Sequence, residues 1–200
     1  MKFMIATHNA KKLKELSRIL NPLGICAVTD TEEGLCLPEV EETGVTFAEN
    51  AFLKAESACK VSGLPSIADD SGLMVDALNG APGVYSARYA GEEGTPEDCN
   101  RKLLAELEGV ANENRTARFA SAICCVFPNG AVLTSEGTCE GMIGTAPKGE
   151  GGFGYDPLFY VGEKSFAEMT DTEKDAVSHR GVALRLFAEK LKQYLEETVC

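Results

Sequence analysis

The sequence predicts an α/β fold in which helices flank a mixed β-sheet. Short apolar runs of strand length alternate along the chain with segments whose apolar residues recur at helical spacing. A Pro-Asn-Gly turn at 128–130 joins two runs of strand character, 118–127 and 131–139, and so predicts a hairpin. With 200 residues, 44% of them hydrophobic, the chain is long enough for one sizeable core, and we expect a single domain spanning 1–200.

The first third of the chain predicts strand, helix, strand, loop and helix in that order. The second helix is expected to begin after Thr46, because Glu49 completes a capping box with that residue, and to end near Gly63. Before it, we expect a strand at 2–6, a helix at 13–20, a second strand at 25–28 and an acidic loop at 32–42.

The remaining elements begin with a short strand at 66–68 and an extended segment at 73–77, with two acids between them. Thr95-Pro96 predicts the start of a third helix, since Thr suits the N-cap and Pro the first helical position. After the hairpin, an amphipathic helix is expected from about residue 177 to 196.

Charge and composition exclude several classes of protein. The formal net charge of -12 provides no basic surface for a nucleic acid, and no apolar run is long enough to span a bilayer. None of the eight cysteines forms a C-x-x-C pair, so zinc ribbons and thioredoxin-type sites are unsupported. We expect a soluble cytoplasmic protein with reduced thiols.

A polar loop follows the first predicted strand and has the features of a phosphate site. The sequence Thr7-His8-Asn9-Ala10-Lys11-Lys12 lies where the strand passes into a helix, and helix N-termini attract anions. The pattern is not a Walker A loop. An ordinary helix N-terminus with solvated lysines remains the alternative.

Two adjacent acids, Asp69 and Asp70, follow the short strand and precede Ser71-Gly72. Carboxylates at a strand end suit a hard cation such as Mg²⁺, and Glu41 and Glu42 are candidates for a further ligand. An Asx-turn that closes the strand is the alternative, because Asp, Ser and Gly are common in turns.

A glycine-rich loop at 151–157 carries two aromatic residues and an acid. Phe153 suits stacking on a purine, and Asp156 suits acceptance of hydrogen bonds from ring N–H groups. A structural loop whose aromatics fill the core is the alternative. Lys174, His179 and Arg180 lie further on, and alone they would be read as a solvated helix cap.

The order of these segments resembles the inosine triphosphate pyrophosphatase family, which removes ITP, dITP and XTP from nucleotide pools. The resemblance covers nearly the whole chain. One departure is that His8 and Lys11 stand where the family commonly has glycine. The matching segments are T-H-N-A-K-K, E-E-T-G-V-T-F-A-E-N-A, I-A-D-D-S-G-L, P-G-V-Y-S-A-R-Y-A-G, G-F-G-Y-D-P-L-F and S-H-R-G-x-A-L.

The resemblance implies a function and a role for each motif. Hydrolysis of a non-standard purine triphosphate to monophosphate and pyrophosphate would use Mg²⁺, with Glu41 and Asp70 linked to the metal and Asp70 as general base. The family also implies a homodimer and an elongated mixed sheet bent into two lobes around a central substrate cleft. Residues implied to bind substrate are Thr7, His8, Asn9, Ala10, Lys11, Lys12, Ser71, Phe153, Gly154, Tyr155, Asp156, Lys174, His179 and Arg180.

Some alternatives stay open on the sequence alone. Asp69 competes with Asp70 for the role of base, since spacing does not separate adjacent acids. A non-catalytic nucleotide sensor would need no base, and a hydrolase of modified pyrimidine triphosphates or of the terminal phosphate would retain the acids. Selectivity is expected at the purine 6-position, where donors from His179 or Arg180 would favour a carbonyl over the amino group of adenine.

Overall fold

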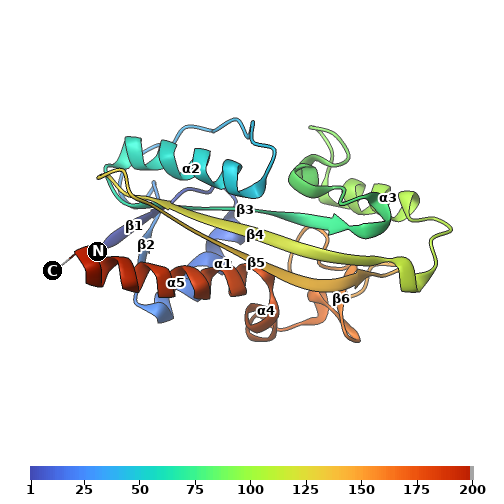
Figure 1. The fold of residues 1–200 in the computed structure, drawn as a ribbon. Coiled ribbons are helices and arrows are strands. Elements are labelled where there is room, and N and C mark those ends of the chain that lie inside the picture. The colour runs from blue at the N-terminus through green and yellow to red at the C-terminus, as the bar shows by residue number, and fades with distance from the viewer. Residues whose placement is uncertain (199–200) are drawn as a thin grey trace. The chain divides into compact units, whose positions relative to one another are not determined.

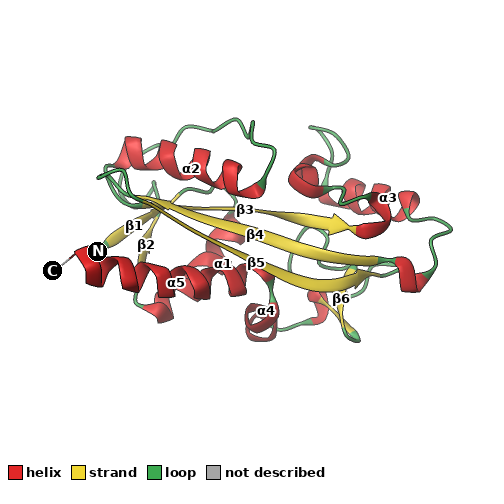
Figure 2. Ribbon diagram, viewed as in Figure 1, coloured by secondary structure: helices red, strands yellow, loops and turns green. Residues whose placement is uncertain are grey.

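The computed structural model describes residues 1–198 and contains seven strands and five α-helices within that part of the chain. The helices are α1 (Ala10–Leu20), α2 (Phe47–Ser62), α3 (Pro96–Glu106), α4 (Asp171–Val177) and α5 (His179–Thr198). The strands are β1 (Lys2–Ile5), β2 (Cys26–Val28), β3 (Ser66–Val75), β4 (Thr116–Val126), β5 (Val132–Ile143), β6 (Phe159–Val161) and β7 (Lys164–Ser165). Figures 1 and 2 show these elements from one viewpoint.

The strands form one mixed sheet in the order β2-β1-β3-β4-β5-β6-β7. β1 runs parallel to β2 and β3, with Ile5 opposite Ile67, whereas β5, β6 and β7 pair antiparallel. The predicted hairpin is confirmed, since β4 and β5 are neighbours joined at the Pro-Asn-Gly turn, where Gly130 N–H donates to the Phe127 carbonyl. The predicted α/β class with flanking helices is therefore confirmed.

The chain divides into two compact units. Among the described residues, unit 1 comprises 1–70, 121–137 and 180–198, and unit 2 comprises 71–120 and 138–179. Strand alternation explains the core of unit 1, because successive side chains of β1 point to opposite faces. Phe3 and Ile5 pack with α1 and α5, while Met4 and Ala6 pack with α2.

Unit 2 has its own apolar core. Leu73 and Val75 of β3 pack there with Cys99 and Leu103, which lie one turn apart on α3. An aromatic group completes this core: the Phe119 ring lies 4.7 Å from Phe159 and 5.8 Å from Phe166, centroid to centroid. This core supports the glycine-rich loop described below, because Tyr155 belongs to it.

Local capping chemistry sets the helix boundaries where the sequence predicts them. Thr46 accepts from the Glu49 amide in a full capping box before α2, and Thr95 and Asp98 form another before α3. One additional helix and one boundary differ from expectation. α4 was not expected, and α5 begins at His179 because Ser178, in an extended conformation, ends α4.

The strand that carries the two acids also differs from expectation. β3 is continuous from Ser66 to Val75, so Asp69 and Asp70 lie inside a strand rather than at its end, and the Asx-turn alternative is wrong. Within residues 1–198, no helix is both long and apolar enough to cross a membrane.

Candidate active site

The predicted phosphate loop connects β1 to α1. Asn9 is the N-cap of α1, and its side-chain oxygen accepts hydrogen bonds from the amides of Lys11 and Lys12 at 3.0 and 3.1 Å. Thr7 Oγ1 in turn accepts from the Asn9 amide at 3.2 Å. Two first-turn amides therefore already serve the cap, and an arriving anion would compete with the Asn9 side chain for them.

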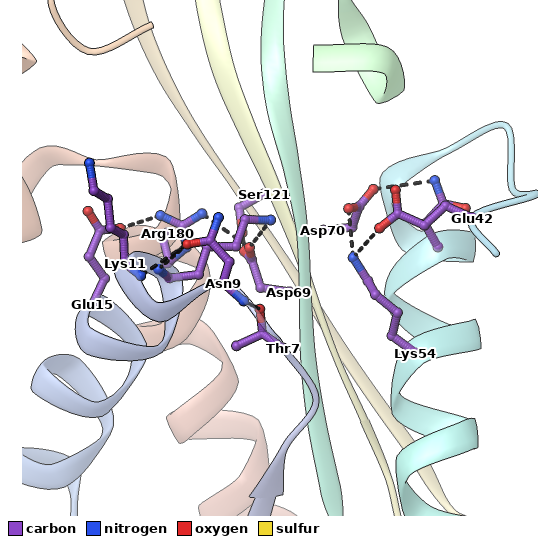
Figure 3. Close-up of polar contacts among 12 residues, drawn as sticks. Thr7, Asn9, Lys11, Glu15, Glu42, Lys54, Asp69, Asp70, Ser121 and Arg180 are labelled. Carbon is purple, nitrogen blue, oxygen red and sulfur yellow. Dashed lines mark hydrogen bonds and ion pairs between the residues drawn. The ribbon is translucent and has the colours of Figure 1, made fainter. Parts of the chain in front are cut away.

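The two neighbouring carboxylates of β3 face opposite sides of the strand. Successive residues of a strand point in opposite directions, so Asp69 faces α1 and α5 whereas Asp70 faces α2. Figure 3 shows the two side chains on either side of β3, each with its own partners. The structure thus separates two acids that spacing alone leaves equivalent.

Asp69 is a buried carboxylate surrounded by donors. Its Oδ2 lies 3.0 Å from Lys12 Nζ and 3.1 Å from Arg180 Nη2, and its Oδ1 accepts from Ser121 Oγ at 2.6 Å. Burial alone would raise the pKa of Asp69, but the charges of Arg180 and Lys12 outweigh burial and hold this pKa well below its usual value. Asp69 therefore remains ionised and is unsuited to accept a proton.

Asp70 has a different environment on the α2 side. Its Oδ1 lies 2.8 Å from Lys54 Nζ, and the same ammonium lies 2.7 Å from Glu42 Oε1. Burial raises the pKa of Asp70 above its ordinary value, although the Lys54 charge opposes that rise. A buried carboxylate whose pKa is raised and whose position is fixed by an ammonium is suited to act as a general base.

A buried asparagine connects Asp70 to the loop before α2. Asn50 Nδ2 lies 3.4 Å from Asp70 Oδ2, and Asn50 Oδ1 accepts from the Gly44 amide at 2.8 Å. A Cβ at Gly44 would lie 2.6 Å from that oxygen, so only glycine allows this approach. The E-E-T-G segment is thereby fixed against Asp70, with Glu42 as the acid that shares Lys54.

The glycine-rich loop of unit 2 has its own hydrogen bonds. Asp156 Oδ2 accepts from the Phe153 amide at 2.7 Å and lies 2.7 Å from Lys174 Nζ, and both charged groups are buried. The Lys174 ammonium also lies 5.1 Å from the centroid of the Phe153 ring. A Cβ at Gly152 would lie 2.0 Å from the Asp156 carboxylate, which excludes any other residue there.

The two residues at the start of α5 lie in different surroundings. The imidazole of His179 is buried in unit 2 and stacks on Phe119, with ring centroids 4.7 Å apart. Arg180 is buried in unit 1, where its guanidinium bonds to Asp69 and to Glu15. Neither residue is the solvated cap that the local sequence alone suggests.

Comparison with known proteins decides the family. A model of the Ham1 family matches residues 3–190. The chain belongs to the Ham1 family. The match takes in all six segments quoted above, so the resemblance to nucleotide pyrophosphatases is confirmed at the level of the family.

Relatives within the Ham1 family match over their full lengths. The dITP/XTP pyrophosphatase of Desulforamulus reducens is 51% identical over an alignment of 202 positions, which covers 100% of this chain and 100% of the relative. That of Haemophilus influenzae is 50% identical and covers 95% of this chain and 98% of the relative. The solved HAM1 protein from Coxiella burnetii has a TM-score of 0.86 at 43% identity, covering 96% of this chain and 99% of that one.

Lys54 contacts Asp70 but lies outside the six segments and was not among the predicted site residues. A signal is present in the sequence, since Asn50 and Lys54 stand four residues apart and therefore on one face of α2. Ala51 and Ala55 are buried beside them. Polar residues among buried positions of a helix indicate partners elsewhere in the fold, here Asp70.

The cysteines of this Ham1 chain are mostly buried. Cys59, Cys99, Cys124, Cys125 and Cys139 are buried free thiols, and Cys26 and Cys36 are exposed free thiols. Burial raises the pKa of Cys124 to about 11, so its thiol stays protonated at neutral pH. The expected structural role of Cys124 and Cys125 agrees with this burial. Cys200 lies outside the described residues.

Proposed function

We propose that this protein hydrolyses non-standard purine nucleoside triphosphates, namely dITP, ITP and XTP, to the monophosphate and pyrophosphate. The observation that carries this proposal is Asp70, a buried carboxylate of raised pKa held between Lys54 and Asn50. The names of the relatives in D. reducens and H. influenzae support the same reaction. Removal of such nucleotides keeps them out of DNA and RNA.

In the proposed reaction, a water molecule attacks the α-phosphorus and pyrophosphate leaves. Asp70 accepts one proton of that water as the new P–O bond forms, and its raised pKa brings proton affinity closer to working pH. Lys54 holds the carboxylate in place and can compensate negative charge that develops on the phosphoryl oxygens. Asp69 instead anchors Lys12 and Arg180.

Mg²⁺ is the proposed cofactor. The pair Asp70 and Glu42, which share one ammonium in this structure, is a donor set that fits a hard cation, and the predicted ligand Glu41 is the neighbour of Glu42. When bound, the ion would neutralise phosphate charge and polarise the bond to the leaving group. The proposed ligands are therefore Asp70, Glu41 and Glu42.

The two ends of the substrate are assigned to different residues. We assign the triphosphate to the Thr7–Lys12 loop and to Ser71, where exposed His8, Ala10 and Lys11 surround the Asn9 cap. We assign the base to Phe153, whose ring is half-buried, and to the loop that continues through Gly154, Tyr155 and Asp156, with Lys174, His179 and Arg180.

Base choice provides a first prediction. If His179 donates to the purine 6-carbonyl, His179→Ala should lower kcat/KM for ITP and XTP about tenfold to hundredfold. The kcat/KM for ATP should change little, because adenine has no 6-carbonyl to accept this hydrogen bond. The measurement is kcat/KM for ITP, XTP, GTP and ATP. Arg180→Ala should show the same selectivity change together with lower stability, since it also leaves Asp69 without one partner. An equal fall for all four substrates would reassign base recognition to the Phe153 loop.

Lys54 provides a second prediction through the pH profile. Its charge lowers the pKa of Asp70, so Lys54→Met should raise that pKa and move the acidic limb of kcat/KM to higher pH. Lys54→Arg should restore the position of the limb in part. Lys60→Met is the matched control, because Lys60 is exposed on the same helix and forms a surface ion pair with Glu56. An unshifted limb in Lys54→Met would show that Asp70 is not the titrating base.

The experiment that tests the function is product analysis on purified protein. Incubation of ITP, XTP, dITP, ATP and a modified pyrimidine triphosphate with Mg²⁺ should give pyrophosphate and monophosphate from the first three. Excess chelator should abolish turnover, and full activity in chelator would exclude a required metal. Orthophosphate as the product would indicate cleavage at the terminal phosphate, and binding without turnover would indicate a sensor.

We also infer a cytoplasmic location, where nucleotide pools lie, and assembly as a homodimer with no nucleic-acid or membrane partner. Light scattering on the purified chain checks the oligomeric state. A monomer that is fully active at nanomolar concentration would exclude a dimer as a requirement for turnover.

A further inference from the structure

A residue outside all six motifs contacts the glycine-rich loop. Asn100, on α3, donates a hydrogen bond from Nδ2 to the carbonyl of Gly154 at 3.0 Å. Gly154 lies directly after Phe153 and has a positive φ of 60°. Because a backbone carbonyl at such a turn has no strand or helix partner of its own, a side-chain donor fixes its direction.

The position of Asn100 is itself fixed. The Thr95 and Asp98 capping box sets the start of α3, and Cys99 and Leu103 bury that helix in the core of unit 2. The Asn100 Oδ1 atom is buried, and no residue among 1–198 offers it a hydrogen bond. Burial of the side chain therefore leaves the Asn100 oxygen without a hydrogen bond from the described chain, while its nitrogen bonds to Gly154. This arrangement favours a role for Asn100 in holding the loop.

A second contact holds the next residue of the loop. Tyr155 is buried, and its hydroxyl donates to the Ser86 carbonyl at 2.9 Å. Ser86 Oγ in turn accepts from the Leu73 amide of β3 at 2.9 Å. The loop is thus tied to rigid elements at Gly154 and Tyr155, immediately after the half-buried ring of Phe153.

We propose that Asn100 is a positioning residue for base binding, which acts by holding Gly154 so that the Phe153 ring keeps its orientation. This inference rests on the proposed assignment of the base to the Phe153 loop. Asn100 reaches the loop rather than the reacting phosphate, so its loss should weaken binding of substrate and transition state equally. Such a change raises KM and leaves kcat unaltered.

The test compares Asn100→Leu and Asn100→Asp with Arg101→Leu. Leucine removes the donor at similar volume, aspartate places an acceptor against the Gly154 carbonyl, and Arg101 is an exposed neighbour on the same helix. We expect the KM for ITP and XTP to rise about five- to tenfold in both Asn100 variants, with kcat within about twofold of the parent. Arg101→Leu should match the parent.

A double-mutant cycle with Phe153→Ala separates this role from general loosening of the fold. If Asn100 acts through the ring, Asn100→Leu should raise KM little further in the Phe153→Ala background. Additive effects, or a fall in kcat without a rise in KM, would overturn the inference. Should Asn100→Leu not fold, Asn100→Asp and Asn100→Ser provide the same measurement.

The cycle also distinguishes the inference from the proposed function. A rise in KM in Phe153→Ala with none in folded Asn100→Leu would overturn the role of Asn100 and leave the base site in place. No effect of Phe153→Ala on KM would overturn both. Conversion of ITP to products other than pyrophosphate would overturn the proposed reaction but not the role of Asn100. Product analysis detects that outcome independently of the KM values.

Discussion

Replacing Asp70 by asparagine is expected to lower kcat by about a hundredfold or more while the protein stays folded. The amide keeps the size of the side chain and can still contact Asn50, but it cannot accept the proton of the attacking water. General acid–base catalysis contributes about 10²- to 10⁴-fold, which sets the scale of the loss. The measurement is kcat for ITP with saturating Mg²⁺.

A matched control separates the base role from loss of charge. Asp76 follows β3 directly and forms a solvent-exposed ion pair with Arg118, so Asp76→Asn removes one carboxylate without touching the site. Its kcat should equal that of the parent. Near-normal kcat in a folded Asp70→Asn protein would assign the base role to another group.

In contrast to Asp70→Asn, which should stay folded, Asp69→Asn is expected to cause a large loss of stability. This substitution removes the buried carboxylate that pairs with the Lys12 ammonium and with Arg180, and it leaves the buried guanidinium with Glu15 as its remaining carboxylate. Breaking a buried pair by removing one partner costs about 3–5 kcal/mol. The free energy of unfolding in urea at pH 7 should fall by about this amount, whereas Asp76→Asn should change it by less than about 1 kcal/mol.

The pH dependence of stability follows from the direction of each pKa shift. The pKa of folded Asp69 lies below its ordinary value of 3.8, so its stabilisation is complete above that value and is lost as pH falls through the folded pKa. The stability difference between parent and Asp69→Asn should therefore shrink only in strong acid. Equal urea midpoints for parent and Asp69→Asn would contradict this account.

Burial gives Asp70 a raised pKa, so its ionisation costs stability at neutral pH. Asp70→Asn should therefore unfold no more easily than the parent.

The starts of α2 and α3 and the order of elements as far as β5 could be predicted from the sequence because their causes are local. Thr46 with Glu49, and Thr95 with Asp98, act within four residues, and the structure shows both capping boxes. The shape of β3 could not be predicted in this way. Asp, Ser and Gly favour turns, but pairing of β3 within the sheet outweighs that preference and extends the strand through them.

The partners of the two acids depend on contacts distant in sequence. Arg180 stands 111 residues after Asp69, and Lys54 stands 16 residues before Asp70, so no local pattern joins either pair. The choice between Asp69 and Asp70 was open for that reason. The alternation of the strand, together with the helices on each face, gives the two acids different partners.

That alternation makes the β3 segment intolerant of insertions. One residue added between Ile67 and Asp69 would leave the pairing of Ile67 with Ile5 in place but turn every later side chain of the strand to the other face. Asp69 would then be directed at the ammonium of α2 and Asp70 at the buried guanidinium of α5. The proposed proton acceptor and the carboxylate that pairs with Arg180 would thereby exchange faces, so β3 tolerates no insertion between Ile67 and the two acids.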